Sequence, residues 1–250
     1  MTESPSIERF AEHEFKRVLC VVAHPDDVEY GTSAAVAEWT DNGVEVAYLL
    51  LTKGEAGMQI PPEECARIRR GEQERACEQV GVSNLTMLDH PDGMLMYTLE
   101  LRRDIARVIR TFRPDAVVTG MWDVEAPWAL NMADHRVAGL VTADAIRDAD
   151  NTWVHPELAR VAALPKWGAR WLLVGGHPKP THGVPVSAGS VSRAVASLEA
   201  HEEYLAAIPG HPAPGDFIPE ILAGGGKAMG EDHAVLFRAF DLRGRPAGGQ

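Results

Sequence analysis

A short apolar run, Val18–Ala23, passes directly into the polar segment His24-Pro25-Asp26-Asp27. A valine-rich run without polar alternation is typical of a strand that is buried on both faces of a parallel sheet. Such a strand needs helices on both sides of its sheet to exclude water. We therefore expect an α/β fold in which residues 24–27 lie at the carboxyl end of a buried strand.

The alternation of strand and helix patterns continues as far as residue 175. Strands are predicted at 44–51, 85–88, 116–119 and 171–174, and helices at 32–42, 61–80, 99–112 and 134–148. This order is the signature of a Rossmann-like, three-layer, doubly wound and mostly parallel sheet.

The last third of the chain has a weaker pattern. It predicts a helix at 190–207, a loop rich in proline and glycine at 209–230 and an edge strand at 234–240, and therefore a loop-rich C-terminal part. We treat the 250 residues as a single domain, because this length suits one α/β core. Within it we expect a leader at 1–16, a Rossmann-like core at 17–175 and C-terminal elements at 176–250.

The charge balance limits the partners of the chain. It has 24 basic and 36 acidic residues, which give a formal net charge of -12 at pH 7. Such a surface repels the phosphates of nucleic acid and of anionic lipid, so we expect neither nucleic acid nor membrane as a partner. Three cysteines without a CxxC pair, and an N-terminus without the basic and apolar stretches of a signal peptide, favour a cytoplasmic location.

Two segments with histidine and aspartate follow predicted strands, where open α/β sheets bind their ligands. His24 and Asp27 come directly after the first strand, and His135 begins the helix after the fourth. Three such ligands plus one water are the arrangement of a catalytic zinc ion. Asp26 and Asp27 are neighbours, so their side chains point in different directions. We therefore assign Asp27 to the metal and Asp26 to the general base that takes a proton from water.

These residues also have structural interpretations. Aspartate is a preferred N-cap residue, so the His-Pro-Asp turn or Asp134 can simply cap a helix. Asp134 and Glu29 can instead hold a metal ligand by a hydrogen bond, although an acidic residue also favours the start of a helix. The lack of a GxGxxG pattern after the first strand argues against a nucleotide-dependent enzyme.

The ordered motifs resemble a known family. The segment 23–29, Ala-His-Pro-Asp-Asp-Val-Glu, is similar to the signature of the PIG-L/LmbE-like zinc N-deacetylases. Further matches, in order, are Thr52-Lys53-Gly54-Glu55-Ala56-Gly57, Arg69-x-x-Glu72, Pro91-Asp92-Gly93, Arg113-Pro114-Asp115 and Asp134-His135-Arg136. The resemblance extends over residues 17–148 and, more weakly, to the helix around His201.

The resemblance implies roles for the matching residues. His24, Asp27 and His135 would hold Zn²⁺, although a histidine and carboxylate set also accepts Fe²⁺ or another divalent ion. Asp26 would be the catalytic base. Arg69 and Asp92 would bind substrate hydroxyls, and His201 would line the pocket as a further catalytic residue.

The resemblance also implies an activity. Members of this family hydrolyse an N-acyl amide, usually N-acetyl, of an amino sugar or glycoconjugate, with water activated by zinc. Related members cleave amides of thiol conjugates, including mycothiol conjugates, and this is the alternative within the family. The substrate would be a small molecule, and a homo-oligomer is compatible with the family.

One position departs from the family pattern. The family has a histidine three residues before its second histidine ligand, where this chain has Met132. That histidine is associated with the oxyanion of the tetrahedral intermediate, and a thioether cannot donate a hydrogen bond. Asn131, His201 and His182 are the candidate replacement donors. The departure also raises a different hypothesis, a metal-bearing binding protein that has lost catalysis.

Overall fold

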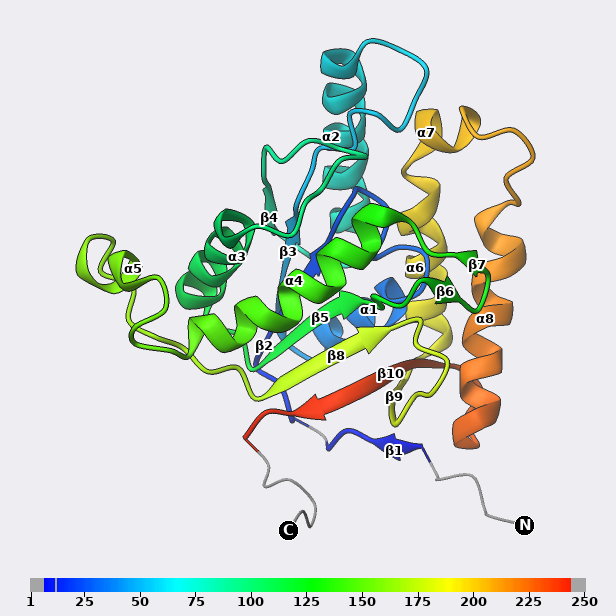
Figure 1. Ribbon diagram of the computed structural model, residues 1–250. Coiled ribbons are helices and arrows are strands. Elements are labelled where there is room, and N and C mark those ends of the chain that lie inside the picture. The colour runs from blue at the N-terminus through cyan, green and yellow to red at the C-terminus, as the bar shows by residue number, and fades with distance from the viewer. Residues whose placement is uncertain (1–6, 12, 244–250) are drawn as a thin grey trace.

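The computed structural model describes residues 7–11 and 13–243. Eight strands form one mixed sheet in the order β1-β9-β10-β8-β5-β2-β3-β4 (Figure 1). The strands are β1 (Glu8–Arg9), β2 (Arg17–Val22), β3 (Glu45–Leu50), β4 (Asn84–Met87), β5 (Ala116–Gly120), β8 (Trp171–Gly175), β9 (His182–Pro185) and β10 (Ala234–Asp241). Two short strands, β6 (Glu125–Ala126) and β7 (Ala129–Leu130), pair with each other outside this sheet.

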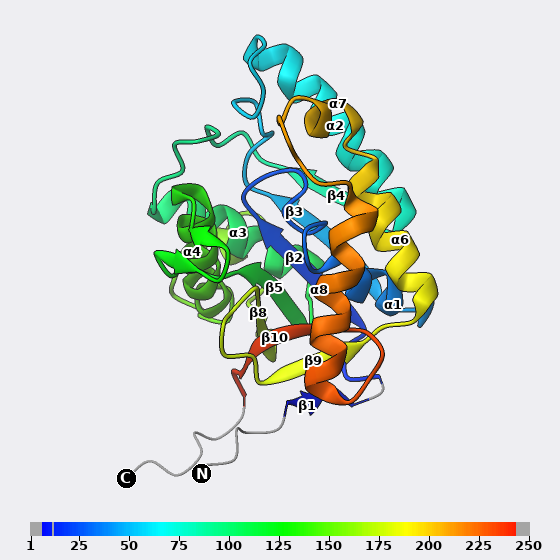
Figure 2. The same ribbon diagram turned by 90° about the vertical axis from the view of Figure 1, so that its right-hand side faces the viewer.

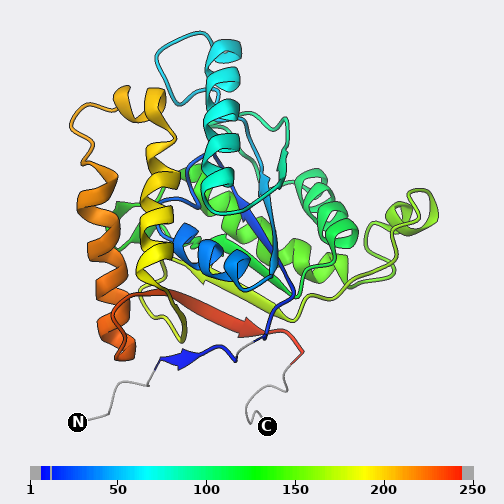
Figure 3. The ribbon, with the colours of Figure 1, turned by 180° about the vertical axis from the view of Figure 1, so that it is seen from behind.

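Helices cover both faces of the sheet, as Figure 2 shows from its side. One face carries α3 (Leu99–Phe112) and α4 (Ala133–Ala149), and the other carries α1 (Ser33–Asp41), α6 (Ala188–Glu199) and α8 (Pro214–Met229). Helix α2 (Pro62–Gln79) packs against α6, and α7 (Glu202–Ala206) packs against α2 (Figure 3). The short α5 (Pro156–Arg160) follows α4. The predicted three-layer α/β fold is therefore confirmed.

Strand β2 explains why its sequence has no polar alternation. Val18, Cys20 and Val22 pack into the core cluster on the α1 and α6 side, while Leu19 and Val21 pack into the cluster on the α3 and α4 side. All five side chains are buried. Removing this apolar surface from water on both faces is the main stabilisation of the strand.

The central place of β2 determines where the site lies. It pairs in parallel with β3 on one side and with β5 on the other. The chain first builds outward from β2 to β3 and β4, and then from β5 to β8 in the opposite direction. The order reverses between β2 and β5, and ligands of open α/β sheets bind at such a reversal, beyond the carboxyl ends of the strands.

The prediction of a loop at 209–230 is wrong, because most of this segment is α8. Pro214 lies in the first turn of the helix, where its fixed φ fits and no amide hydrogen is needed. Gly225 lies against the backbone: a Cβ there would be 2.2 Å from the carbonyl oxygen of Ala234. Gly230 ends the helix in the left-handed conformation, with φ of 74°. The glycines therefore serve close packing and helix termination.

Two further expectations about the C-terminal part need correction. The predicted helix 190–207 is divided at His201 into α6 and α7. The predicted edge strand at 234–240 is β10, which pairs antiparallel with both β8 and β9 inside the sheet. Strand order had no signal in the local pattern, and the edge is instead formed by β1, part of the expected leader. Residues 1–6 of that leader lie outside the described residues.

In the part of the chain that the structure describes, no helix combines the length and the apolarity that crossing a bilayer requires.

Candidate metal centre

A tight turn after β2 sets the directions of the first candidate ligands. The backbone amide of His24 donates a hydrogen bond to Oδ2 of Asp27, over 2.9 Å. Asp26 between them has φ of +86°, a left-handed conformation that residues other than glycine rarely adopt. Its backbone amide donates to Oε1 of Gln73 at 3.0 Å. This turn directs the Asp26 and Asp27 carboxylates to different partners, as their adjacency predicts.

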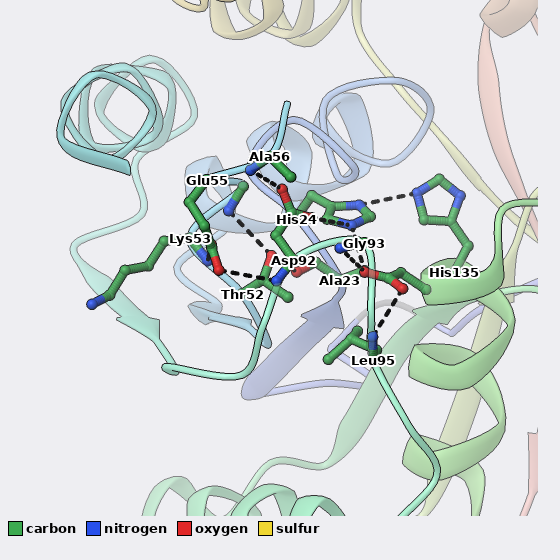
Figure 4. A network of polar contacts seen from close by, with 12 residues as sticks. Ala23, His24, Thr52, Lys53, Glu55, Ala56, Asp92, Gly93, Leu95 and His135 are labelled. Carbon is green, nitrogen blue, oxygen red and sulfur yellow. Dashed lines mark hydrogen bonds and ion pairs between the residues drawn. The ribbon is translucent and has the colours of Figure 1, made fainter. Parts of the chain in front are cut away.

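His24, Asp27 and His135 converge on one point. His135 Nε2 lies 3.3 Å from His24 Nδ1 and 3.0 Å from Asp27 Oδ1. One potential ligand atom from each of the three residues lies within 4.8 Å of the others. Figure 4 shows the His24 and His135 rings directed toward each other, from the β2 turn and from the start of α4. The structure thus brings together all three residues predicted as metal ligands.

The other nitrogen of His24 is held by two carboxylates. Nε2 lies 3.0 Å from Asp92 Oδ1 and 3.2 Å from Asp134 Oδ2. Asp134 also accepts the backbone amides of Gly93 at 2.7 Å and Leu95 at 3.1 Å. Histidines that bind metals usually donate their second nitrogen to a carboxylate, which fixes the ring and its tautomer. The geometry fits such a role for Asp92 and Asp134 better than a second metal site built on the same histidine.

The structure tests whether Asp134 is the N-cap of α4. The N-cap residue is Met132, and Asp134 lies in the first helical turn. The interpretation of Asp134 as an N-cap is therefore wrong, because its carboxylate oxygens face the 93–95 loop and His24 rather than the helix amides.

The electrostatics of the cluster suit a cation. Burial would lower the pKa of His24, but the charge of Asp27 and hydrogen bonds to Asp134 and Asp92 raise it to about 12. Burial would raise the pKa of Asp27, but His135 and His24 lower it below its usual range. The carboxylates of the cluster therefore favour a positive charge beside them. Two imidazole nitrogens and one carboxylate oxygen are a donor set that fits a divalent metal ion such as zinc.

Asp26 lies beside the cluster and pairs with Arg69. Arg69 Nη2 is 2.9 Å from Asp26 Oδ2, and both side chains are buried. The Arg69 guanidinium also donates to the carbonyl of Pro25 and stacks 3.5 Å from the centre of the Tyr204 ring. Burial raises the pKa of Asp26 to about 7, although Arg69 acts to lower it. A carboxylate with this pKa suits proton transfer near neutral pH.

The predicted substrate contacts are engaged within the protein. Arg69 is 2% exposed and faces Asp26, while Asp92 is 8% exposed and contacts His24. Asp92 Oδ2 also accepts the backbone amide of Ala56 at 2.7 Å (Figure 4). Their binding of substrate hydroxyls stays a prediction.

Glu29 is predicted to hold a metal ligand by a hydrogen bond, but its side chain contacts Gln73 and Ser197 and makes no described hydrogen bond to His24, Asp27 or His135. Its Oε1 accepts from Gln73 Nε2 at 3.0 Å and from Ser197 Oγ at 3.4 Å. Gln73 links it to the Asp26 backbone, and the sequence interpretation missed this residue. It lies four positions after Arg69, on the same face of a helix, and this spacing was the available signal.

The three proposed replacements for the missing family histidine lie in different surroundings. Asn131 Nδ2 donates to the carbonyls of Met121 and Asp123, at 2.9 and 3.1 Å. His182 is on β9, stacked on Phe10. His201 is fully buried, and neither of its ring nitrogens has a partner among the described residues. None of the three makes a described contact with the metal-ligand cluster, and Met132 itself is 56% exposed.

A family model described as PIG-L, GlcNAc-PI de-N-acetylase, matches residues 19–146 of this sequence. The chain belongs to this family. The matched range contains the three candidate metal ligands, Asp26 and Asp134, and it ends within α4.

Individual relatives of the PIG-L chain are similar over shorter stretches. A diacetylchitobiose deacetylase from Thermococcus kodakarensis is 38% identical over 137 residues, which cover 54% of this chain and 50% of the relative. A 1D-myo-inositol 2-acetamido-2-deoxy-alpha-D-glucopyranoside deacetylase from Kineococcus radiotolerans is 41% identical over 98 residues, covering 36% and 27%. The chain thus spans half or less of the length of these two curated relatives.

A solved structure is similar over nearly the whole chain. It is the N,N'-diacetylchitobiose deacetylase from Pyrococcus horikoshii in complex with its inhibitor MPG. The TM-score is 0.81 with 23% sequence identity, and the match covers 93% of this chain and 88% of the other. At this identity the likeness supports the fold alone.

Proposed function

We propose that this chain is a zinc-dependent hydrolase that cleaves the N-acyl amide of an amino sugar or glycoconjugate. The observation that carries the proposal is the convergence of His24 Nδ1, Asp27 and His135 Nε2 within 4.8 Å. Membership of the PIG-L family and the names of the two curated deacetylases support this substrate class. Iron in place of zinc stays an alternative, since the donors suit both.

The residues of the chain divide the chemistry between them. A zinc ion bound here would polarise the acyl carbonyl and lower the pKa of water toward about 7. Asp26 takes the proton of the attacking water and then delivers it to the leaving amine. Arg69 holds the Asp26 carboxylate in place at 2.9 Å. Asp92 and Asp134 hold the His24 ring so that Nδ1 faces the other two ligands.

The test begins with the metal. We expect the zinc-loaded chain to release acetate from N,N'-diacetylchitobiose or N-acetylglucosamine glycosides. Removal of the metal with a chelator should abolish release, and added zinc should restore it. Unchanged release from a preparation with no measurable metal would refute the proposed mechanism.

Met132 supports a second candidate, a metal-bearing protein that binds a glycoside or thiol conjugate without cleaving it. No described contact replaces the family histidine, so the carbonyl would depend on the metal alone for polarisation. Turnover that Asp26→Asn removes would reject this candidate. A side-by-side assay with a mycothiol conjugate separates the amidase alternative from the amino-sugar deacetylase. The cytoplasmic location and a homo-oligomeric state stay predictions.

A further inference from the structure

An apolar cavity opens directly beside the metal-ligand cluster. Its volume is ≈ 480 Å³, and Asp27 and His135 form part of its wall. Much of the remaining wall is apolar and includes Val22, Val28, Val118, Met121, Phe217 and Ile221. A ligand in this cavity would therefore touch the cluster at one end and hydrocarbon along its length.

Apart from Asp27 and His135, polar side chains are few in the wall, and two of them are already hydrogen-bonded within the protein. The Tyr30 hydroxyl is paired with His211 Nε2 at 2.7 Å. The Asn131 amide nitrogen already donates to two backbone carbonyls. Thr32 and Thr119 also line the cavity, and the Thr119 hydroxyl has no hydrogen-bond partner among the described residues. The several hydroxyl groups of a sugar would still exchange hydrogen bonds with water for these few partners, which is unfavourable. The wall therefore favours the apolar part of a substrate.

The cavity meets the cluster at Asp27 and His135, which face Nδ1 of His24. An N-acyl amino sugar has its hydroxyls on the amine side of the amide and its hydrocarbon on the acyl side. With the acyl chain in the cavity, the hydrocarbon contacts the apolar wall and the hydroxyls stay outside the cavity.

We propose that the cavity binds the acyl chain of the substrate and that a medium-length chain is preferred over acetyl. This inference rests on the proposed function and specifies its substrate. At ~30 Å³ for each group the size of a water molecule, an octanoyl chain would fill ~240 Å³. An acetyl group leaves most of the cavity without a partner. The exposed Trp128 and Ile221 at the wall, 62% and 51% exposed, extend the apolar surface outward for longer chains.

Two glycines keep the cavity open. Gly31 and Gly120 both line it, and a Cβ added at either position would meet no atom within 4 Å. Neither residue has a left-handed backbone, so a larger side chain is compatible with its conformation. The Cβ of a leucine at Gly31 therefore has free space, and the rest of its side chain would take up part of the cavity. Gly224, exposed on α8 and likewise free of neighbours within 4 Å, offers the matched substitution outside the cavity.

The experiment compares acyl chain lengths on one sugar. With the zinc-loaded chain, kcat/KM for N-octanoylglucosamine should exceed that for N-acetylglucosamine at least tenfold, since each buried methylene is worth about fourfold. Gly31→Leu should lower the octanoyl-to-acetyl ratio at least tenfold, and Gly224→Leu should leave it unchanged. Gly120→Leu serves as the second filling variant if Gly31→Leu does not fold.

Three outcomes would overturn the inference. Acetyl release with a flat dependence on chain length is the first, and a ratio insensitive to both filling variants is the second. The third is a gain that appears with an octyl glycoside of N-acetylglucosamine instead of the octanoyl amide. If no acyl group of any length is released, the proposed function fails. Calorimetric binding of octanamide against acetamide then decides the cavity, because binding that Gly31→Leu removes supports it and no binding refutes it.

Discussion

Replacing Asp134 with asparagine should weaken zinc binding although it removes no proposed metal ligand. The carboxylate is 2% exposed and has three partners: His24 Nε2 at 3.2 Å and the amides of Gly93 and Leu95 at 2.7 and 3.1 Å. Asparagine has one acceptor oxygen and an NH2 group that can only donate. Its oxygen can accept at one of the two carboxylate positions, of which one faces His24 and Gly93 and the other faces Leu95. Its NH2 group must then face donors at the other position.

The expected magnitudes follow from these contacts. Loss of the carboxylate behind a metal-binding histidine costs about 10- to 100-fold in metal affinity. One buried amide left without an acceptor costs about 1–3 kcal/mol in the free energy of unfolding. The loss of unfolding free energy should be present in the metal-free protein, whereas the loss of affinity should appear only when zinc binding is measured.

Two measurements separate these effects. Zinc affinity is measured by competition with a chromogenic chelator, and stability by urea unfolding of the metal-free protein. The control is Asp144→Asn, on the same helix, where the carboxylate accepts a hydrogen bond from the Tyr97 hydroxyl near the surface. A zinc affinity of Asp134→Asn equal to that of this control would refute the orienting role.

Three further results are expected. Asp26→Asn should retain zinc and lower kcat by about 100- to 10,000-fold, as loss of a general base does, with metal content and kcat measured on one preparation; a smaller loss assigns the base elsewhere. Tyr204→Ala should lower the free energy of unfolding by about 1–2 kcal/mol, because the cation–π contact between the half-buried Tyr204 and the buried Arg69 is lost, whereas Tyr204→Phe keeps the ring and should not. Burial lowers the pKa of His201 to about 3, so the native state excludes a proton that the unfolded chain accepts below its ordinary value of 6.5. Stability from this source is complete above pH 6.5 and is lost as the pH falls, by about 2 kcal/mol at pH 5. His24 and Asp26, whose pKa values are raised, act in the opposite direction in the metal-free protein. The measurement is therefore urea unfolding of the wild type and of His201→Leu in chelator, and the stability of the wild type relative to the variant should fall by about 2 kcal/mol between pH 7 and pH 5.

Much of the site could be predicted because its residues follow strands. The apolar run 18–23 predicts a strand buried on both faces, and parallel strands end at one edge of a sheet. The sequence therefore predicts that His24, Asp27 and His135 lie at the same edge of the sheet. In the structure, one potential ligand atom of each lies within 4.8 Å of the others.

Other features had no local signal. Helix α8 looks like a loop because proline and glycine are counted as turn residues, whereas Gly225 is there to let α8 approach Ala234. The Arg69 pairing with Asp26 depends on a contact between residues 43 positions apart in the chain, which no spacing rule reports. Gly31 and Gly120 shape the cavity by the absence of a side chain, and an absence leaves no periodic pattern.

The interior place of β10 has a consequence for biosynthesis. At about 5–20 residues per second, the stretch between the end of β8 and the start of β10 takes roughly 3–12 seconds to translate. During that interval one edge of β8 has no partner, because its neighbour on that side is β10. A free apolar strand edge can pair with another nascent chain. Slower initiation of translation, which spaces the nascent chains apart, or a chaperone that covers the edge of β8 should therefore raise the yield of folded protein.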